Sequence, residues 1–201
     1  MRTARTTLTA ATALVAALTL AGCATGQQNQ TEAPPAASSP AAEAEFNDAD
    51  VMFAQMMIPH HEQAIEMSDS LLEKDGVDEQ VRDLAQQIKD AQQPEIDQMK
   101  DWLDAWGEDE LGDMGGMDHD MGGMGDGMMS DEDMAQLEDA SGAEASRLFL
   151  EQMILHHEGA IQMAEYQVQE GENPDAVALA ERIVEDQTEE IATMQDLLAT
   201  I

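Results

Sequence analysis

One pattern of methionines, histidines and aliphatic residues occurs twice in this chain and constrains its fold more than any other feature. Residues 56–67 read MMIPHHEQAIEM and residues 152–163 read QMILHHEGAIQM, a shift of 96 residues. The segments that follow also match, with a shift of 95 residues: Leu84, Ala85, Ile88, Gln92, Glu95, Ile96 and Met99 correspond to Leu179, Ala180, Ile183, Gln187, Glu190, Ile191 and Met194. Such a repeat indicates two copies of one helical hairpin, and therefore an all-α four-helix bundle with pseudo-two-fold symmetry.

Apolar residues recur at helical spacing in four long segments, and no strand pattern competes with them. We expect helices from Asn47 or Asp48 to about Glu73, from Asp78 to about Trp106, from about Ala143 to Glu170, and from Asn173-Pro174 onward. A short helix is expected to begin at Ser130 or Asp133 and to stop at Ser141-Gly142. Gly76 is a candidate cap for the first helix, and Pro59 predicts a kink or a shifted hydrogen bond inside it.

The first 45 residues predict an export signal and a tether rather than a fold. Residues 1–22 combine two arginines with an apolar run too short for a good membrane span, and the run ends in a lipobox-like Leu-Ala-Gly-Cys. In that pattern Cys23 is acylated and anchors the exported protein to the outer face of the cell membrane, or to a membrane that faces the periplasm. The alternative is an ordinary secretory signal with an incidental cysteine. Residues 23–45 lack large apolar groups and predict a disordered, flexible tether.

The charge balance limits the classes of partner. The formal net charge is −35, which argues against nucleic-acid binding because that requires basic patches. It suits a protein that meets cations, although a solvated acidic surface explains it equally well. Cys23 is the single cysteine, so the sequence excludes an internal disulfide and a thiolate metal cluster.

A low-complexity segment, residues 107–130, separates the two repeats of the expected domain (residues 46–106 and 131–201 within 46–201). It is rich in glycine and aspartate and holds closely spaced donors: Met114, Met117, His119, Met121, Met124, Met128 and Met129. Methionine sulfurs on such a chain can wrap a soft cation, with His119 and the aspartates as further donors. The alternative is a solvated linker whose methionines are incidental.

The two histidine pairs are the candidate metal ligands within the bundle. Met57 and His61 are one helical turn apart and can face the same ion, and Met153 with His157 repeats this arrangement. Imidazole suits copper, zinc, iron and nickel, whereas thioether sulfur favours copper, above all Cu(I) over Cu(II). The alternative is a metal-free core in which the histidines bond to Glu95 and Glu190, two carboxylates that a mostly apolar helix face must pair or bind.

The pattern Met-Ile-x-His-His-x-x-Ala-Ile-x-Met, followed by Gln-x-x-Glu-Ile-x-x-Met, resembles the bacterial domain of unknown function 305 family over about residues 46–201. The resemblance implies a ferritin-like four-helix bundle, export, and a role in copper binding or tolerance. It also implies these site residues: His60, His61, Met67, Glu95, Met99, His156, His157, Met163, Glu190 and Met194. The Glu-x-x-His pattern of ferritin di-iron sites is absent from these helices, which argues against a ferroxidase.

These observations predict an extracytoplasmic lipoprotein that sequesters copper or hands it on, with a metal ion and the membrane as its partners. Two alternatives stay open: a metal-dependent oxidase on the same bundle, and a metal-free lipoprotein that docks other proteins through its acidic helices. The sequence nominates no catalytic residue, so we expect a binding protein rather than an enzyme.

Overall fold

The computed structural model describes residues 45–110 and 127–201, which form five helices and no strand. The helices are α1 (Asp48–Leu72), α2 (Glu79–Trp106), α3 (Asp131–Asp139), α4 (Gly142–Glu170) and α5 (Pro174–Leu198). The all-α prediction is therefore confirmed. The predicted signal segment, Cys23, the tether up to residue 44 and most of the central linker lie outside the described residues. In the part described, no helix is long and apolar enough to cross a membrane.

The predicted caps explain where most helices begin. The side chains of Asn47, Asp78, Ser130 and Asn173 each accept a hydrogen bond from a backbone amide in the first turn that follows. At the other end of α1, the expectation that Gly76 caps the helix was wrong. That helix ends at Leu72 with Glu73 as its cap, and Gly76 instead takes a φ of +75° in the turn before α2.

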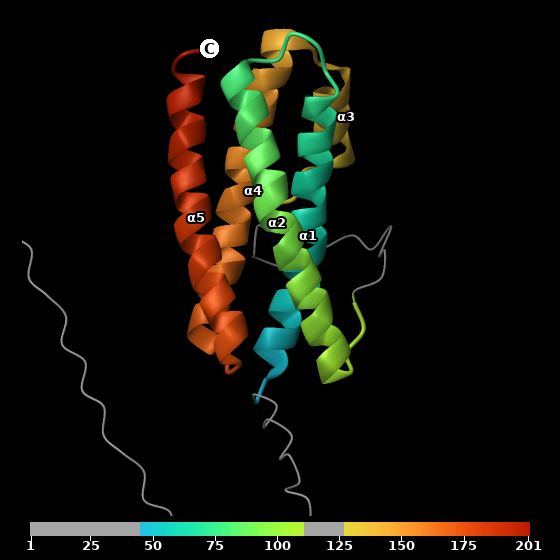
Figure 1. Cartoon of the computed structure of the whole chain (residues 1–201), viewed down its shortest axis with the longest axis vertical. Coiled ribbons are helices and arrows are strands. Elements are labelled where there is room, and N and C mark those ends of the chain that lie inside the picture. The colour runs from blue at the N-terminus through green and yellow to red at the C-terminus, as the bar shows by residue number, and fades with distance from the viewer. Residues whose placement is uncertain (1–44, 111–126) are drawn as a thin grey trace, which may run out of the picture. The chain divides into compact units, whose positions relative to one another are not determined.

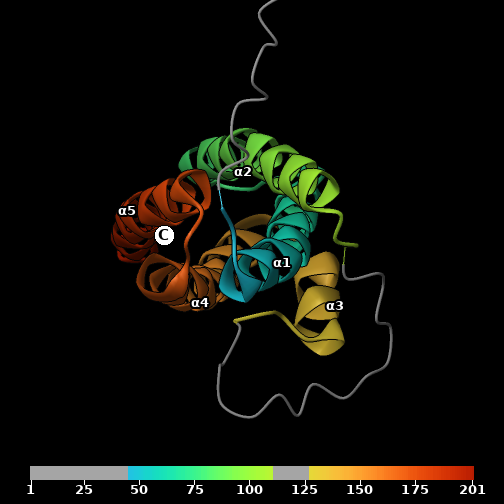
Figure 2. The ribbon, with the colours of Figure 1, turned by 90° about the horizontal axis from the view of Figure 1, so that it is seen from below.

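The four long helices form two antiparallel hairpins, α1–α2 and α4–α5 (Figure 1). Seen along the helices, α1, α2, α5 and α4 follow one another around a ring, and α3 lies outside it next to α1 (Figure 2). The main contact between the hairpins joins α1 to α4, and α3 packs on both of these helices. α1 runs through Pro59 as one helix.

Two apolar cores fill the bundle, one on each side of the histidines. The first core joins the N-terminal half of α1 and the C-terminal half of α2 to the C-terminal half of α4 and the N-terminal half of α5. Its buried residues are Phe53, Ala54, Met57, Ile58, Ile96, Met99, Leu103, Ala160, Met163, Ala164, Leu179, Ala180 and Ile183. The second core uses the opposite halves of these helices together with α3. Its buried residues are Ala64, Met67, Leu71, Val81, Leu84, Ala85, Ile88, Leu137, Ala145, Phe149, Leu150, Met153, Met194 and Leu197. Each core thus combines one half of a helix with the opposite half of its repeat equivalent. The sequence repeat predicts this arrangement if α1 packs antiparallel on α4.

A buried carboxylate ties the start of α1 to the turn between α4 and α5. Asp50 is fully buried, and its Oδ2 accepts hydrogen bonds from the amides of Asn47, Glu172 and Asn173 at 2.9, 3.1 and 3.0 Å. Its Oδ1 accepts another from Nε2 of Gln167. Gly171 lies against this pair, and a Cβ there would come within 2.8 Å of the Asp50 carboxylate. The second repeat has Ser146 at the position equivalent to Asp50.

Candidate metal centre

The two histidine pairs meet at the middle of the bundle, between the two apolar cores. We call His60, His61, His156 and His157 the histidine centre; each is at most 1% exposed. The rings of His60 on α1 and His156 on α4 lie with their centroids 3.7 Å apart and their planes inclined by 38°. These two residues occupy equivalent positions of the repeat, so the pseudo-two-fold axis passes between them. The prediction that the histidines face the interior is confirmed.

Each repeat contributes one histidine that is bonded to a glutamate of the neighbouring helix. Nε2 of His61 lies 2.8 Å from Oε2 of Glu95, and Nε2 of His157 lies 2.7 Å from Oε2 of Glu190. The histidines are fully buried, whereas the glutamate side chains are 19% and 21% exposed. The carboxylates therefore connect the histidine centre to the surface of the bundle.

These pairs leave the second ring nitrogen of each histidine available. A carboxylate oxygen accepts hydrogen bonds, so Nε2 of His61 and of His157 carries the hydrogen. The two Nδ1 atoms are buried and have no hydrogen-bond partner within the described chain. A carboxylate bonded to one ring nitrogen while the other faces a metal is the usual support of a metal-bound histidine. The geometry is thus compatible with both the metal site and the metal-free pairing that the sequence suggested.

Burial makes His156 a neutral donor. Desolvation lowers the pKa of His156 well below its ordinary value, and the three other imidazoles of the centre lower it further. The ring therefore carries no extra proton near pH 7. A neutral imidazole can bind a metal ion without first releasing a proton.

Two buried glutamines were not among the predicted ligands. Gln92 and Gln187 occupy equivalent positions one turn before Glu95 and Glu190 and are 3% and 4% exposed. The Oε1 atom of each is buried and has no hydrogen-bond partner in the described residues. A buried amide oxygen without a partner is costly, so these atoms are further candidate donors. Their signal in the sequence was the repeated Gln-x-x-Glu itself.

The predicted methionines divide between the two cores. Met57, Met99 and Met163 lie in the first core, and Met67, Met153 and Met194 lie in the second. Within the described residues, no group of three or more His, Cys, Asp or Glu side chains is arranged to hold a metal ion. A metal bound at the histidine centre would therefore need donors of another kind. Besides the two glutamine oxygens, the candidates are the sulfurs of Met57 and Met153, which precede His61 and His157 by one turn on buried helix faces.

The end of the linker that precedes α3 is anchored to α1. Of the seven predicted linker donors, the structure describes two, Met128 and Met129. The amide of Met129 donates to Oε1 of Gln63 at 2.7 Å, and Nε2 of Gln63 donates to the Met129 carbonyl at 2.9 Å. Gln63 follows His61 by two residues on α1. Met114, Met117, His119, Met121 and Met124 lie outside the described residues.

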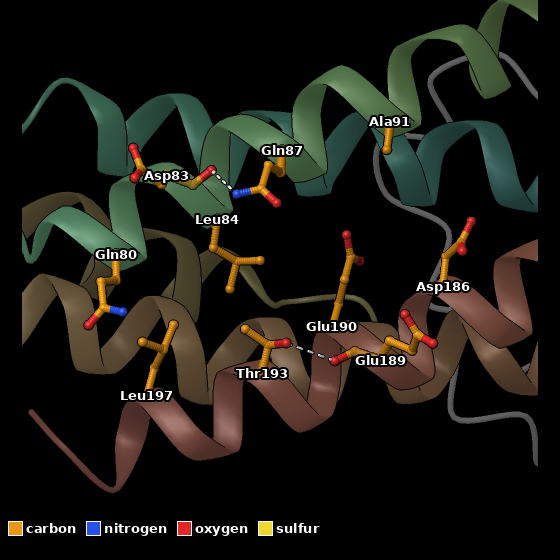
Figure 3. Close-up of a pocket in the computed structure, with 10 residues that line it drawn as sticks. All are labelled: Gln80, Asp83, Leu84, Gln87, Ala91, Asp186, Glu189, Glu190, Thr193 and Leu197. Atoms are coloured by element: carbon orange, nitrogen blue, oxygen red, sulfur yellow. Dashed lines mark hydrogen bonds between the residues drawn. The ribbon is translucent and has the colours of Figure 1, made fainter. Parts of the chain in front are cut away.

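An acidic groove lies between α2 and α5 and reaches one glutamate of the centre. Its volume is about 510 Å³, and Glu190 points from α5 into it (Figure 3). Asp83, Asp186 and Glu189 line the same groove. In the other repeat, the positions equivalent to Asp83, Gln87 and Glu189 hold Ala178, Arg182 and Pro94. Cation attraction is thus concentrated on the Glu190 side.

Comparison with known proteins agrees with this architecture. The model of the DUF305 family, described as a domain of unknown function, matches residues 50–198. A DUF305 fragment from Deinococcus radiodurans is 32% identical, with a TM-score of 0.68 over 77% of this chain and 98% of that one. A DUF305 protein from Streptomyces coelicolor that is predicted to be secreted is 36% identical, with a TM-score of 0.65 over 75% and 91%. The protein CopM in its Cu(II)-bound form is 31% identical, with a TM-score of 0.63 over 75% and 95%, and CopM is also known in Cu(I)-bound and Ag-bound forms. No curated protein sequence matches this chain.

Proposed function

This chain belongs to the DUF305 family, and we propose that it is an exported copper-binding protein that sequesters copper or hands it on through the histidine centre. The duplicated Glu–His pair carries this proposal. Each pair presents a buried Nδ1 atom without a hydrogen-bond partner in the described chain, one helical turn from a buried methionine. The similarity to CopM, which binds Cu(I) and Cu(II), supports copper as the metal.

The donor set favours copper over the common hard cations. Neutral imidazole nitrogen and thioether sulfur bind Cu(I) well, whereas Ca²⁺ and Mg²⁺ require oxygen ligands. His61, His157, Met57 and Met153 supply the nitrogen and sulfur donors, and Gln92 and Gln187 can add a weak oxygen donor. Glu95 and Glu190 hold the two imidazoles in position. Copper is the cargo of such a site rather than a catalytic group, so we propose binding and not an enzymatic reaction.

The acidic groove serves this function by attracting cations. Four carboxylates, those of Asp83, Asp186, Glu189 and Glu190, face one groove and raise the local concentration of positive ions there. Charge of this kind does not distinguish copper from calcium. Selection for copper is therefore left to the sulfur and imidazole donors behind Glu190.

We place the protein outside the cytoplasm, held to the outer face of the cell membrane through a lipid on Cys23. The lipobox-like Leu-Ala-Gly-Cys motivates this placement, and the similarity to a relative predicted to be secreted supports export. Mass spectrometry of the membrane fraction is expected to find a mature N-terminus at Cys23 that carries a diacylglyceryl group. An unmodified Cys23, or cleavage at another bond, would refute the lipid anchor without touching the copper site.

Substituting the linker donors is expected to lower the copper capacity of the protein while the bundle stays folded. The variant changes Met114, Met117, His119, Met121 and Met124 to serine and retains Met129, whose backbone is bonded to Gln63. Copper titration should show fewer Cu(I) equivalents bound per chain, because soft donors are lost. Thermal unfolding of the metal-free protein should be unchanged.

A matched control keeps the sulfur and removes the charge from the same segment. Changing Asp113, Asp118, Asp120 and Asp126 to asparagine should leave the number of Cu(I) equivalents unchanged. Equal capacity in the wild type and the serine variant would contradict a copper role for the linker.

In the same samples, we expect the rate of oxygen uptake with Cu(I) to be no faster than in protein-free solution. Faster uptake would favour the oxidase alternative.

A further inference from the structure

A second group of sulfur donors lies at a small surface pocket between α1 and α4. The pocket has a volume of about 20 Å³ and is lined by Met52, Phe53, Met56, Met163 and Tyr166. That volume is about what one water molecule needs. Met52 and Met56 were not among the predicted ligands, and Met163 was assigned to the histidine centre.

Helix geometry brings the three methionines to one place. Met52 and Met56 are four residues apart and lie on the same side of α1. Met163 comes from α4, which runs antiparallel to α1 at this point. Met52 and Met56 are partly buried and Met163 is 7% exposed. The pocket is therefore only partly exposed to bulk water.

We infer that this pocket binds a monovalent soft cation, Cu(I) or Ag(I), through the thioethers of Met52, Met56 and Met163. Thioether sulfur selects Cu(I) among biological metals, and a d¹⁰ ion imposes little preference on its geometry. Among the described residues no charged side chain lines the pocket, so nothing there stabilises a hard divalent ion. The rings of Phe53 and Tyr166 add aromatic surface that can face a cation.

The other repeat shows that packing alone does not require this sulfur. The positions equivalent to Met52, Met56 and Tyr166 hold Leu148, Gln152 and Ser70, and only Met163 keeps a methionine counterpart, Met67. α3 packs on that side of the bundle, where Nε2 of Gln152 donates to the Asp133 carbonyl at 2.9 Å. At the three methionine positions of the pocket, this repeat arrangement therefore has three sulfurs where the pocket is open. The equivalent positions beside α3 have one.

The inference rests on the proposed function only for the identity of the natural cargo, because a three-thioether site can be tested with silver alone. The probe is Ag(I), added to the full chain in which the five linker donors are serine and methionine is labelled at its methyl carbon. We expect the NMR signals of the Met52, Met56 and Met163 methyl groups to shift together as the pocket takes up about one equivalent beyond any that is bound at the histidine centre. Unshifted signals for these three residues would overturn the inference.

Two variants attribute the signal to the pocket. Met52→Leu with Met56→Leu should weaken Ag(I) binding at the shifted Met163 signal at least tenfold, whereas Met134→Leu, a partly buried methionine on α3, should leave it unchanged. Should the double variant unfold, Met56→Gln provides the residue that the other repeat tolerates, and undiminished Ag(I) binding by it would overturn the inference.

The three shifts should persist in the His61→Ala, His157→Ala chain. Loss of copper binding there, with the shifts retained, separates the histidine centre from the pocket.

Discussion

Replacing His61 and His157 together with alanine is expected to lower the affinity of the bundle for Cu(I) by about 100-fold or more, since changes of supporting residues alone typically cost 10–100-fold. Both imidazoles are fully buried and each offers one ring nitrogen without a hydrogen-bond partner in the described chain. Alanine removes the two imidazoles that Glu95 and Glu190 hold in position, and leaves His60, His156 and the nearby thioethers. Competition with a chromophoric Cu(I) chelator, in the chain whose linker donors are serine, measures the affinity of the bundle alone.

The glutamates provide graded and matched comparisons. Glu95→Gln with Glu190→Gln retains the imidazoles but replaces their carboxylate partners, and should weaken Cu(I) binding by about 10-fold. Glu62→Gln with Glu158→Gln makes the same chemical change in both repeats at exposed acids that follow the histidine pairs. That control should bind Cu(I) like the wild type. Equal copper binding by the wild type and by the double histidine variant with the linker substituted would refute the proposed function.

Folding must be separated from metal binding in these variants. Alanine at two fully buried positions leaves cavities and frees two carboxylates, so the metal-free bundle loses stability. His61→Gln with His157→Gln keeps a side-chain amide that can donate to Glu95 and Glu190 while removing the imidazole nitrogens. A glutamine variant that is folded and has lost Cu(I) affinity assigns the loss to the missing ligands rather than to the cavity.

The sequence predicted the elements well because their determinants are local. Asn47, Asp78, Ser130 and Asn173 cap helices within three residues of themselves, and apolar spacing identifies a buried face without reference to other helices. The sequence repeat gave one prediction about distant parts of the chain, namely that the two hairpins have the same structure. Gly76 was misplaced because a positive φ is favourable in the turn as well as at the helix cap.

The site was predicted as a set of residues but not as a geometry. Spacing places His60 and His61 near the interior, yet the close approach of His60 to His156 depends on how α1 crosses α4. Pairing of the histidines with Glu95 and Glu190 was one of two alternatives that the sequence left open. The packed helices show that the carboxylates bond to the Nε2 atoms. The oxygens of Gln92 and Gln187 lack a partner because no other described group lies within hydrogen-bond reach, which periodicity does not encode.

Asp50→Ala is expected to destabilise the bundle by about 3 kcal/mol, because each buried donor left without a partner costs about 1–3 kcal/mol. The amides of Asn47, Glu172 and Asn173 all donate to one Asp50 oxygen, and Gln167 donates to the other. Alanine removes every one of these acceptors at a fully buried position. Urea unfolding of the metal-free protein, followed by circular dichroism, measures the loss.

Two substitutions test whether hydrogen-bond acceptance is the cause. Asp50→Asn keeps one oxygen for the three amides, and its new amide group can donate to Oε1 of Gln167, which has no partner in the described chain, if the Gln167 side chain turns over. It should therefore cost clearly less than alanine. Ser146→Ala, at the equivalent position of the other repeat, leaves one amide without its acceptor, that of Asp78 at 3.0 Å, and also removes the bond that Oγ donates to the Gly142 carbonyl at 3.2 Å. It should cost about 1 kcal/mol. Equal losses for Asp50→Ala and Ser146→Ala would show that the four donors around Asp50 do not need its carboxylate, and that the α4–α5 turn is held by packing instead.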